Sequence, residues 1–173
     1  GVNAAGVHRF AHAKSAVKAL DWCPWSSRLL ATGAGVNDRC VRLYDVSTGQ
    51  LMRTTQTKGQ VSGVAWSRRL RALLTAGGFC DKRVRVRDRT TLRSTFSFES
   101  RGGRILGLAC NADGTMACSV DAEERLVFWR LSGDTSRAEC PSVPTESAIS
   151  ALDDPRARMS QPQTSAGMRY GLS

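Results

Sequence analysis

The sequence has 173 residues, and its 25 lysine and arginine residues outnumber 15 aspartate and glutamate residues to give a formal net charge of +10. This length is sufficient for one domain of ordinary size. No apolar run approaches the roughly 18 residues that a membrane-spanning helix needs. We therefore expect a basic globular protein without a membrane partner.

The stretch 16–46 contains two apolar runs, a glycine-rich turn and a third run in which apolar and polar side chains alternate. Similar stretches begin at Val61 and at Ile105. Short runs of this kind, bounded by Pro, Ser, Gly, Asn and Asp, are typical of antiparallel strands.

Equivalent positions in the three stretches keep a common spacing. Two sets show it: Trp22, Trp66 and Cys110 at intervals of 44 residues, and Tyr44, Arg87 and Trp129 at intervals of 43 and 42. A period just over forty residues with four short strands per unit indicates the blades of a WD-repeat β-propeller. The predicted fold is all-β, with antiparallel four-stranded sheets.

The repeats predict the domain organisation. Outer strands are expected at 50–55 and 92–98, whereas the third repeat lacks an outer strand of its own. Because a propeller needs about four to eight blades to close, we interpret the chain as the C-terminal part of a longer, seven-bladed propeller. The predicted order is a connection or strand remnant at 1–12, repeats at 13–57, 58–99 and 100–131, and a flexible tail at 132–173.

Two structural roles follow from the repeat pattern. The innermost strand of each blade is nearly all apolar, as at Trp22 and Trp66, which predicts burial on both faces. An acidic residue stands three positions before the third strand's first apolar residue and is expected to cap a tight turn by accepting backbone N–H bonds. These turn residues are Asp38, Asp81 and Glu123.

The sequence gives no catalytic or metal-binding pattern. The six cysteines form no C-x-x-C pair and have no histidine partners at metal-ligand spacing. Neither His8 nor His12 lies beside a nucleophile or carboxylate in a catalytic arrangement. We expect no enzyme activity, no metal and no cofactor, and free cysteines suit the reducing nucleus and cytoplasm.

The arginine clusters allow two interpretations. An acidic partner or nucleic acid is one, and the solvated face of half-exposed strands is the other. The lack of interleaved aromatic residues argues against nucleic acid. The clustered residues are Arg68, Arg69, Arg71, Arg83, Arg85, Arg87 and Arg89.

The stretch 16–49 resembles the repeat of the Fizzy and Fizzy-related proteins, activators of the anaphase-promoting complex. The resemblance rests on Ala-Val-Lys-Ala at 16–19, Trp-Cys-Pro-Trp at 22–25, Leu-Ala-Thr-Gly at 30–33 and Asn-Asp-Arg at 37–39. It continues through the other two repeats and covers 16–131, which implies the last three of the family's seven blades.

The resemblance implies a function and its residues. Family members hand degron-bearing substrate proteins to a ubiquitin ligase, so the implied partners are anaphase-promoting complex subunits, such substrates and checkpoint proteins. Gln60 and Arg104 match positions that contact the KEN degron, where amide and guanidinium donors suit Glu and Asn side chains. Glu124 matches the acidic partner of the destruction-box arginine.

The sequence also departs from the family pattern. Val36 replaces a threonine of the KEN pocket, Arg87 replaces a tryptophan, and Arg101 stands near an expected histidine. The final residues, Leu172 and Ser173, differ from the Ile-Arg end by which the family docks on the ligase. A generic WD-repeat scaffold without degron binding and a polyanion-binding basic surface therefore remain alternative interpretations.

Overall fold

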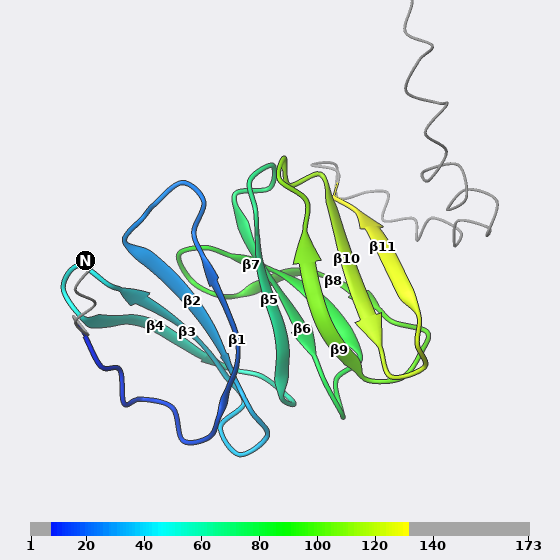
Figure 1. The fold of residues 1–173 in the computed structure, drawn as a ribbon, viewed down its shortest axis with the longest axis horizontal. Helices are drawn as coiled ribbons and strands as arrows, with labels where there is room; N and C mark the ends of the chain where they lie inside the picture. The colour runs from blue at the N-terminus through cyan, green and yellow to red at the C-terminus, as the bar shows by residue number, and fades with distance from the viewer. Residues whose placement is uncertain (1–7, 132–173) are drawn as a thin grey trace, which may run out of the picture. The chain divides into compact units, whose positions relative to one another are not determined.

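The computed structural model describes residues 8–131, which form eleven strands in three antiparallel sheets (Figure 1). Residues 1–7 and the expected flexible tail at 132–173 lie outside the described residues. The described part of the chain contains no helix long and apolar enough to cross a membrane.

Each sheet is a meander in which consecutive strands pair. The first sheet consists of β1 (Val17–Trp22), β2 (Leu29–Ala34), β3 (Cys40–Asp45) and β4 (Gln50–Gln56). The second consists of β5 (Val61–Ser67), β6 (Ala72–Gly77), β7 (Arg83–Asp88) and β8 (Ser94–Glu99). The third consists of β9 (Ile105–Cys110), β10 (Met116–Asp121) and β11 (Leu126–Arg130).

The predicted all-β fold of stacked repeat sheets is confirmed. Among residues 8–131 the third sheet has three strands. The second outer strand begins at Ser94 instead of the predicted position 92. The reason is Leu92, which adopts a left-handed φ of 59° and is fully buried in the preceding turn.

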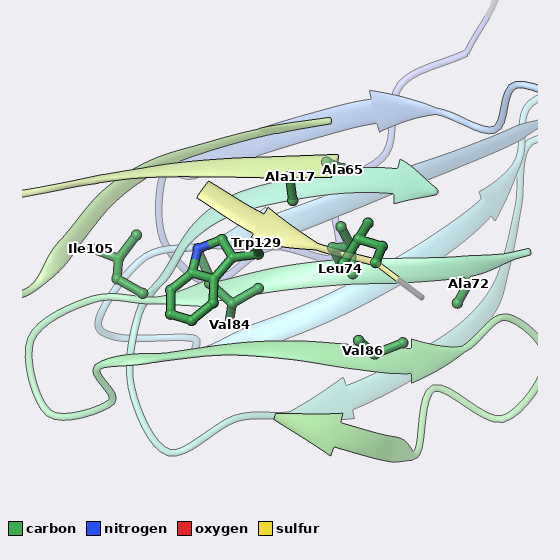
Figure 2. Packing of buried hydrophobic residues seen from close by; sticks show 10 residues of the cluster. Ala65, Ala72, Leu74, Val84, Val86, Ile105, Ala117 and Trp129 are labelled. Atoms are coloured by element: carbon green, nitrogen blue, oxygen red, sulfur yellow. The ribbon is translucent and has the colours of Figure 1, made fainter. Parts of the chain in front are cut away.

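The sheets are held together by two apolar clusters. One joins the first two sheets around Val41 and Leu73. The other joins the second and third sheets, and Figure 2 shows Trp129 of β11 beside Val84 of β7 and Ile105 of β9. Burying one such leucine or isoleucine side chain contributes about 1.5–3 kcal/mol to folding, so the stacking of sheets supplies much of the stability.

The prediction that every innermost strand is buried on both faces is wrong for β1 and also for β9, where Leu106 is 49% exposed. Val17, Leu20 and Trp22 are 48%, 63% and 49% exposed, respectively. β5 is almost wholly buried because it packs between β1 and β9. β1 has a sheet on one side only, within the part of the chain that the structure describes.

The acidic turn residues act mainly through ion pairs with arginine, and not through turn N–H groups as predicted. Asp38 accepts both guanidinium hydrogen bonds of Arg42, and Asp81 likewise pairs with Arg85.

In the third sheet the structure places Asp121, and not Glu123, at the buried position. The Asp121 carboxylate accepts the backbone N–H of Glu123 and that of Arg125, as well as the Arg125 guanidinium. The Glu123 side chain is 57% exposed. Its longer side chain reaches out of the turn, whereas the shorter Asp121 fits inside it.

The arginines of β7 are not a simple solvated face. Arg83 is exposed. Arg85, however, donates a hydrogen bond to the Asp81 carboxylate, and Arg87 is only 5% exposed. Arg87 donates from Nε to the Thr75 hydroxyl at 2.9 Å and from Nη1 to the Leu92 carbonyl at 2.9 Å. Burial lowers the pKa of Arg87 to about 10.

Arg87 occupies the position of an indole in the neighbouring repeat. Trp129 of β11 donates from Nε1 to the Ser119 hydroxyl at 2.9 Å, the same bond that Arg87 makes to Thr75. A planar guanidinium can thus replace the hydrogen bond of an indole, although not its apolar surface.

Candidate functional site

A pocket of about 530 Å³ opens where the three innermost strands begin. Gln60, directly before β5, and Arg104, directly before β9, both line it. Two residues that the resemblance assigned to one degron site, and that lie 44 positions apart in the sequence, therefore share one cavity.

Backbone hydrogen bonds fix the entry to each innermost strand. The N–H of Gly35 donates to the Ala16 carbonyl at 2.9 Å, and the N–H of Gly78 donates to the Gln60 carbonyl at 2.8 Å. Ala122 makes the same bond to Arg104 at 3.0 Å. Because the anchored atom is a carbonyl oxygen in each repeat, the side chain at this position is free to project into the pocket.

Arg104 is further positioned by an aromatic ring. Its guanidinium carbon lies 4.6 Å from the centre of the Phe79 ring, within the range of a cation–π contact. Phe79 lies in the β6–β7 turn with a left-handed φ of 50°, and it is 51% exposed. The contact holds a long, flexible cation at the rim of the pocket.

The electrostatics of the pocket favour a ligand with acceptor oxygens. Arg104 and Lys18 supply positive charge, and Gln60 and Asn37 supply neutral amide groups. No aspartate or glutamate lies among the residues that line this pocket. A ligand carboxylate or amide oxygen could accept hydrogen bonds here without a competing protein carboxylate.

Val36 contributes an apolar side chain to the pocket wall. It is 55% exposed and lies in the turn between β2 and β3. Where the family pattern has a hydroxyl, this wall offers methyl groups. The pocket can therefore make one fewer hydrogen bond to a polar ligand.

Glu124 does not line the pocket. It lies in the turn between β10 and β11, is exposed, and has a left-handed φ of 59°. Its neighbours Glu123 and Arg125 form an ion pair at 2.5 Å. The structure thus separates Glu124 from Gln60 and Arg104.

Sequence reasoning gave no site role to several residues that line the pocket, among them Lys18, Phe79 and Leu106. Phe79 could have been found, because Gly78-Phe79 lies in the turn that the repeat pattern places beside the strand entries. Lys18 and Leu106 lie inside strands that were predicted to be buried, so the pattern gave no reason to choose them.

Comparison with known proteins identifies the repeat. The WD40 family, described as WD domain, G-beta repeat, matches residues 6–45. Cell division cycle 20.1, cofactor of APC complex, from Arabidopsis thaliana is 32% identical over 81% of this chain and 31% of its own length. The anaphase-promoting complex subunit cdc20 of Dictyostelium discoideum is 34% identical over 72% of this chain and 25% of its own.

The chain is similar in sequence to Fizzy and Fizzy-related WD-repeat proteins. Meiotic fizzy-related protein 1 of Schizosaccharomyces pombe is 30% identical over 77% of the chain. A solved structure, the crystal structure of the mitotic checkpoint complex, superposes with a TM-score of 0.66 at 30% identity, covering 70% of this chain and 38% of the other.

This chain spans between 17% and 33% of the length of the curated relatives it matches. The Arabidopsis and Dictyostelium relatives are named as a cofactor and a subunit of the anaphase-promoting complex.

Proposed function

We propose that this chain is a non-enzymatic substrate-recruiting propeller segment that binds degrons for the anaphase-promoting complex and so promotes ubiquitination of cell-cycle proteins. The observation that carries the proposal is the pocket shared by Gln60 and Arg104, which has cationic and amide groups and no carboxylate among its lining residues. Such a site suits the glutamate and asparagine of a KEN-type degron. The names of the relatives support the same ligase as partner.

The proposed partners are anaphase-promoting complex subunits, degron-bearing substrates and checkpoint proteins, in the nucleus and cytoplasm. The destruction-box arginine would pair with Glu124, outside the pocket. An exposed carboxylate can accept two parallel hydrogen bonds from a guanidinium group.

Peptide titration tests the proposal. A fluorescent peptide containing Lys-Glu-Asn is titrated with the full chain and with Gln60→Ala and Arg104→Ala variants. We expect each substitution to weaken binding by about 1–3 kcal/mol, because each removes a donor to a charged or amide group at a partly buried site.

The chain offers matched controls for both variants. Arg101→Ala removes an exposed arginine three positions before Arg104, and Gln56→Ala removes an exposed glutamine on β4. Neither residue lines the pocket. If the controls weaken the peptide as much as the pocket variants, the chain is a scaffold whose pocket does not bind degrons.

A further inference from the structure

The turns at the far end of β5 carry arginines that neither the pocket nor the strand pattern explains. The β5–β6 turn displays Arg68, Arg69 and Arg71, and the β7–β8 turn displays Arg89 and Arg93. All five side chains are exposed. Because β5 to β8 form a meander, both turns lie at the same end of the sheet, opposite the end where Gln60 enters the pocket. We call these five residues the arginine turn surface.

The arginine turn surface has no ion-pair partner among the described residues. The ion pairs of the described residues involve other arginines, such as Arg28 with Asp45. The nearest carboxylate in the sequence, Asp88, is occupied: it accepts the N–H and hydroxyl groups of both Thr90 and Thr91.

Two other carboxylates near these turns are occupied as well. Asp113 accepts the N–H and the hydroxyl of Thr115, and Asp21 accepts the N–H of Trp66. None of these three acids forms an ion pair with an arginine of the arginine turn surface.

The β5–β6 turn is held in place from the neighbouring sheet. The Ser67 hydroxyl donates to the Gly114 carbonyl at 2.7 Å and accepts the N–H of Leu70 at 3.1 Å, and Ser67 is fully buried. Gly114 lies so close that a Cβ there would be 2.4 Å from the Arg68 backbone nitrogen. The backbone that carries the arginines is thus fixed before any partner binds, which lowers the entropy cost of binding.

The surroundings of Trp25 bear on whether the polyanion is a nucleic acid or an acidic protein segment. Nucleic-acid surfaces combine cations with aromatic faces on which bases stack. The guanidinium of Arg71 already lies 4.8 Å from the centre of the Trp25 ring, and Trp66 packs edge-on against the same ring at 5.4 Å. The aromatic ring beside this surface is used internally, which favours an acidic protein segment as ligand.

We propose that the arginine turn surface is a second docking site, which binds a glutamate- and aspartate-rich segment of a partner protein. The site is separate from the degron pocket and does not depend on the proposed function. Arginine guanidinium groups on a fixed backbone can each engage a carboxylate with two parallel hydrogen bonds.

A binding assay with a fluorescein-labelled oligoglutamate peptide tests the proposal. The full chain is compared with a triple variant, Arg68→Gln, Arg69→Gln and Arg89→Gln, at about 50 mM and about 200 mM salt. Arg71 is left intact because it packs on Trp25. We expect the triple variant to bind about tenfold more weakly at low salt, and the wild-type affinity to fall with added salt.

A second triple variant shows whether the loss of binding comes from these particular arginines or from the lower net charge. Lys82→Gln, Arg83→Gln and Arg101→Gln remove the same number of exposed cations from the opposite end of the sheets. We expect this variant to bind within about threefold of wild type. Equal losses in both variants would overturn the proposal, and so would tighter binding of a single-stranded oligonucleotide of the same charge through the same three arginines. Circular dichroism of each variant establishes that all are folded.

Discussion

The Arg42 guanidinium donates two hydrogen bonds of 2.8 Å to the Asp38 carboxylate, and the two side chains are only 7% and 2% exposed. Asp38 also accepts the backbone N–H of Lys14 at 2.7 Å. The pair therefore joins the β2–β3 turn to the chain that enters β1. A buried ion pair of this kind is costly to break, because removing one partner leaves an uncompensated charge.

Arg42→Ala is predicted to lower the free energy of unfolding by about 3 kcal/mol, since it leaves the Asp38 carboxylate buried and without its main partner. Urea denaturation of the full chain at neutral pH measures this change. Arg83→Ala is the control, because the Arg83–Glu99 pair is 45% and 65% exposed and should cost less than about 1 kcal/mol. A loss for Arg42→Ala as small as for the control would contradict the structural role given to the pair.

Stability should fall in acid through Asp38. Hydrogen bonds from Arg42 lower the pKa of Asp38 from 3.8 to about 2. The folded-state pKa lies below the unfolded value, so the ion pair stabilises the fold above about pH 4 and this contribution is lost as the pH falls toward about 2.

We expect the difference in unfolding free energy between wild type and Asp38→Asn to shrink by about 1–2 kcal/mol between pH ~5 and pH ~2.5. Urea unfolding midpoints at both pH values supply the measurement. Asp45 and Asp88, whose pKa values are also lowered by hydrogen bonds, are present in both proteins, so their contributions cancel. A difference that stays constant with pH would exclude Asp38 as the titrating group.

Arg87→Trp is predicted to stabilise the second sheet by about 1 kcal/mol. The indole would keep the hydrogen bond to Thr75, as Trp129 does to Ser119, and would remove the desolvation cost of a buried cation. The substitution gives up the bond to the Leu92 carbonyl. Thermal unfolding followed by circular dichroism decides the sign, and a lower midpoint would mean that the Leu92 bond matters more than the cation's burial.

Residues 16–131 alone are predicted to self-associate instead of forming a well-ordered monomer. β1 exposes Val17, Leu20 and Trp22, and apolar surface at an open sheet promotes association. Leu20→Lys should reduce the association. Met52→Lys on β4 adds the same charge at a residue that is also about half exposed, 52%, and should have less effect. Analytical ultracentrifugation over a concentration series makes the comparison, and a monodisperse wild-type monomer with one sharp melting transition would refute the prediction.

The two degron types should respond to different residues. In a chain completed with its early blades, Glu124→Ala is expected to weaken a destruction-box peptide by about 1–3 kcal/mol and to spare a KEN peptide, and Arg104→Ala to do the reverse. The separation of Glu124 from the pocket motivates this expectation. Calorimetric titration of both peptides against both variants is the measurement, and equal losses for either peptide would identify both residues as ordinary surface groups.

Periodicity made the sheet architecture predictable, because alternation and turn residues report local backbone preference. Strand ends were less predictable. The start of β8 depends on Leu92, a branched residue in a left-handed conformation that is stabilised by its burial against the neighbouring sheet and by the hydrogen bond from Arg87. Such long-range compensation leaves no local pattern.

The site was predictable to the extent that it follows the repeat. Gln60 and Arg104 occupy equivalent positions in two consecutive repeats, so the stacking of the blades places both beside the same pocket. The repeat pattern did not predict that Asp121 would take the buried turn position in place of Glu123, because side-chain length decides which carboxylate fits there. The cation–π contact between Arg104 and Phe79 likewise did not follow from the repeat, because it depends on the conformation of a flexible arginine side chain.

The carbonyl anchors at the strand entries have a consequence for redesign. The same backbone position carries alanine at 16, glutamine at 60 and arginine at 104, and in each repeat its peptide oxygen accepts the hydrogen bond that anchors the strand entry. The carbonyl group of each of these residues therefore stabilises the blade, whereas its side chain is available to contact a ligand. New side chains could be installed at these three positions to change what the pocket accepts while the hydrogen bonds that shape the blades remain intact.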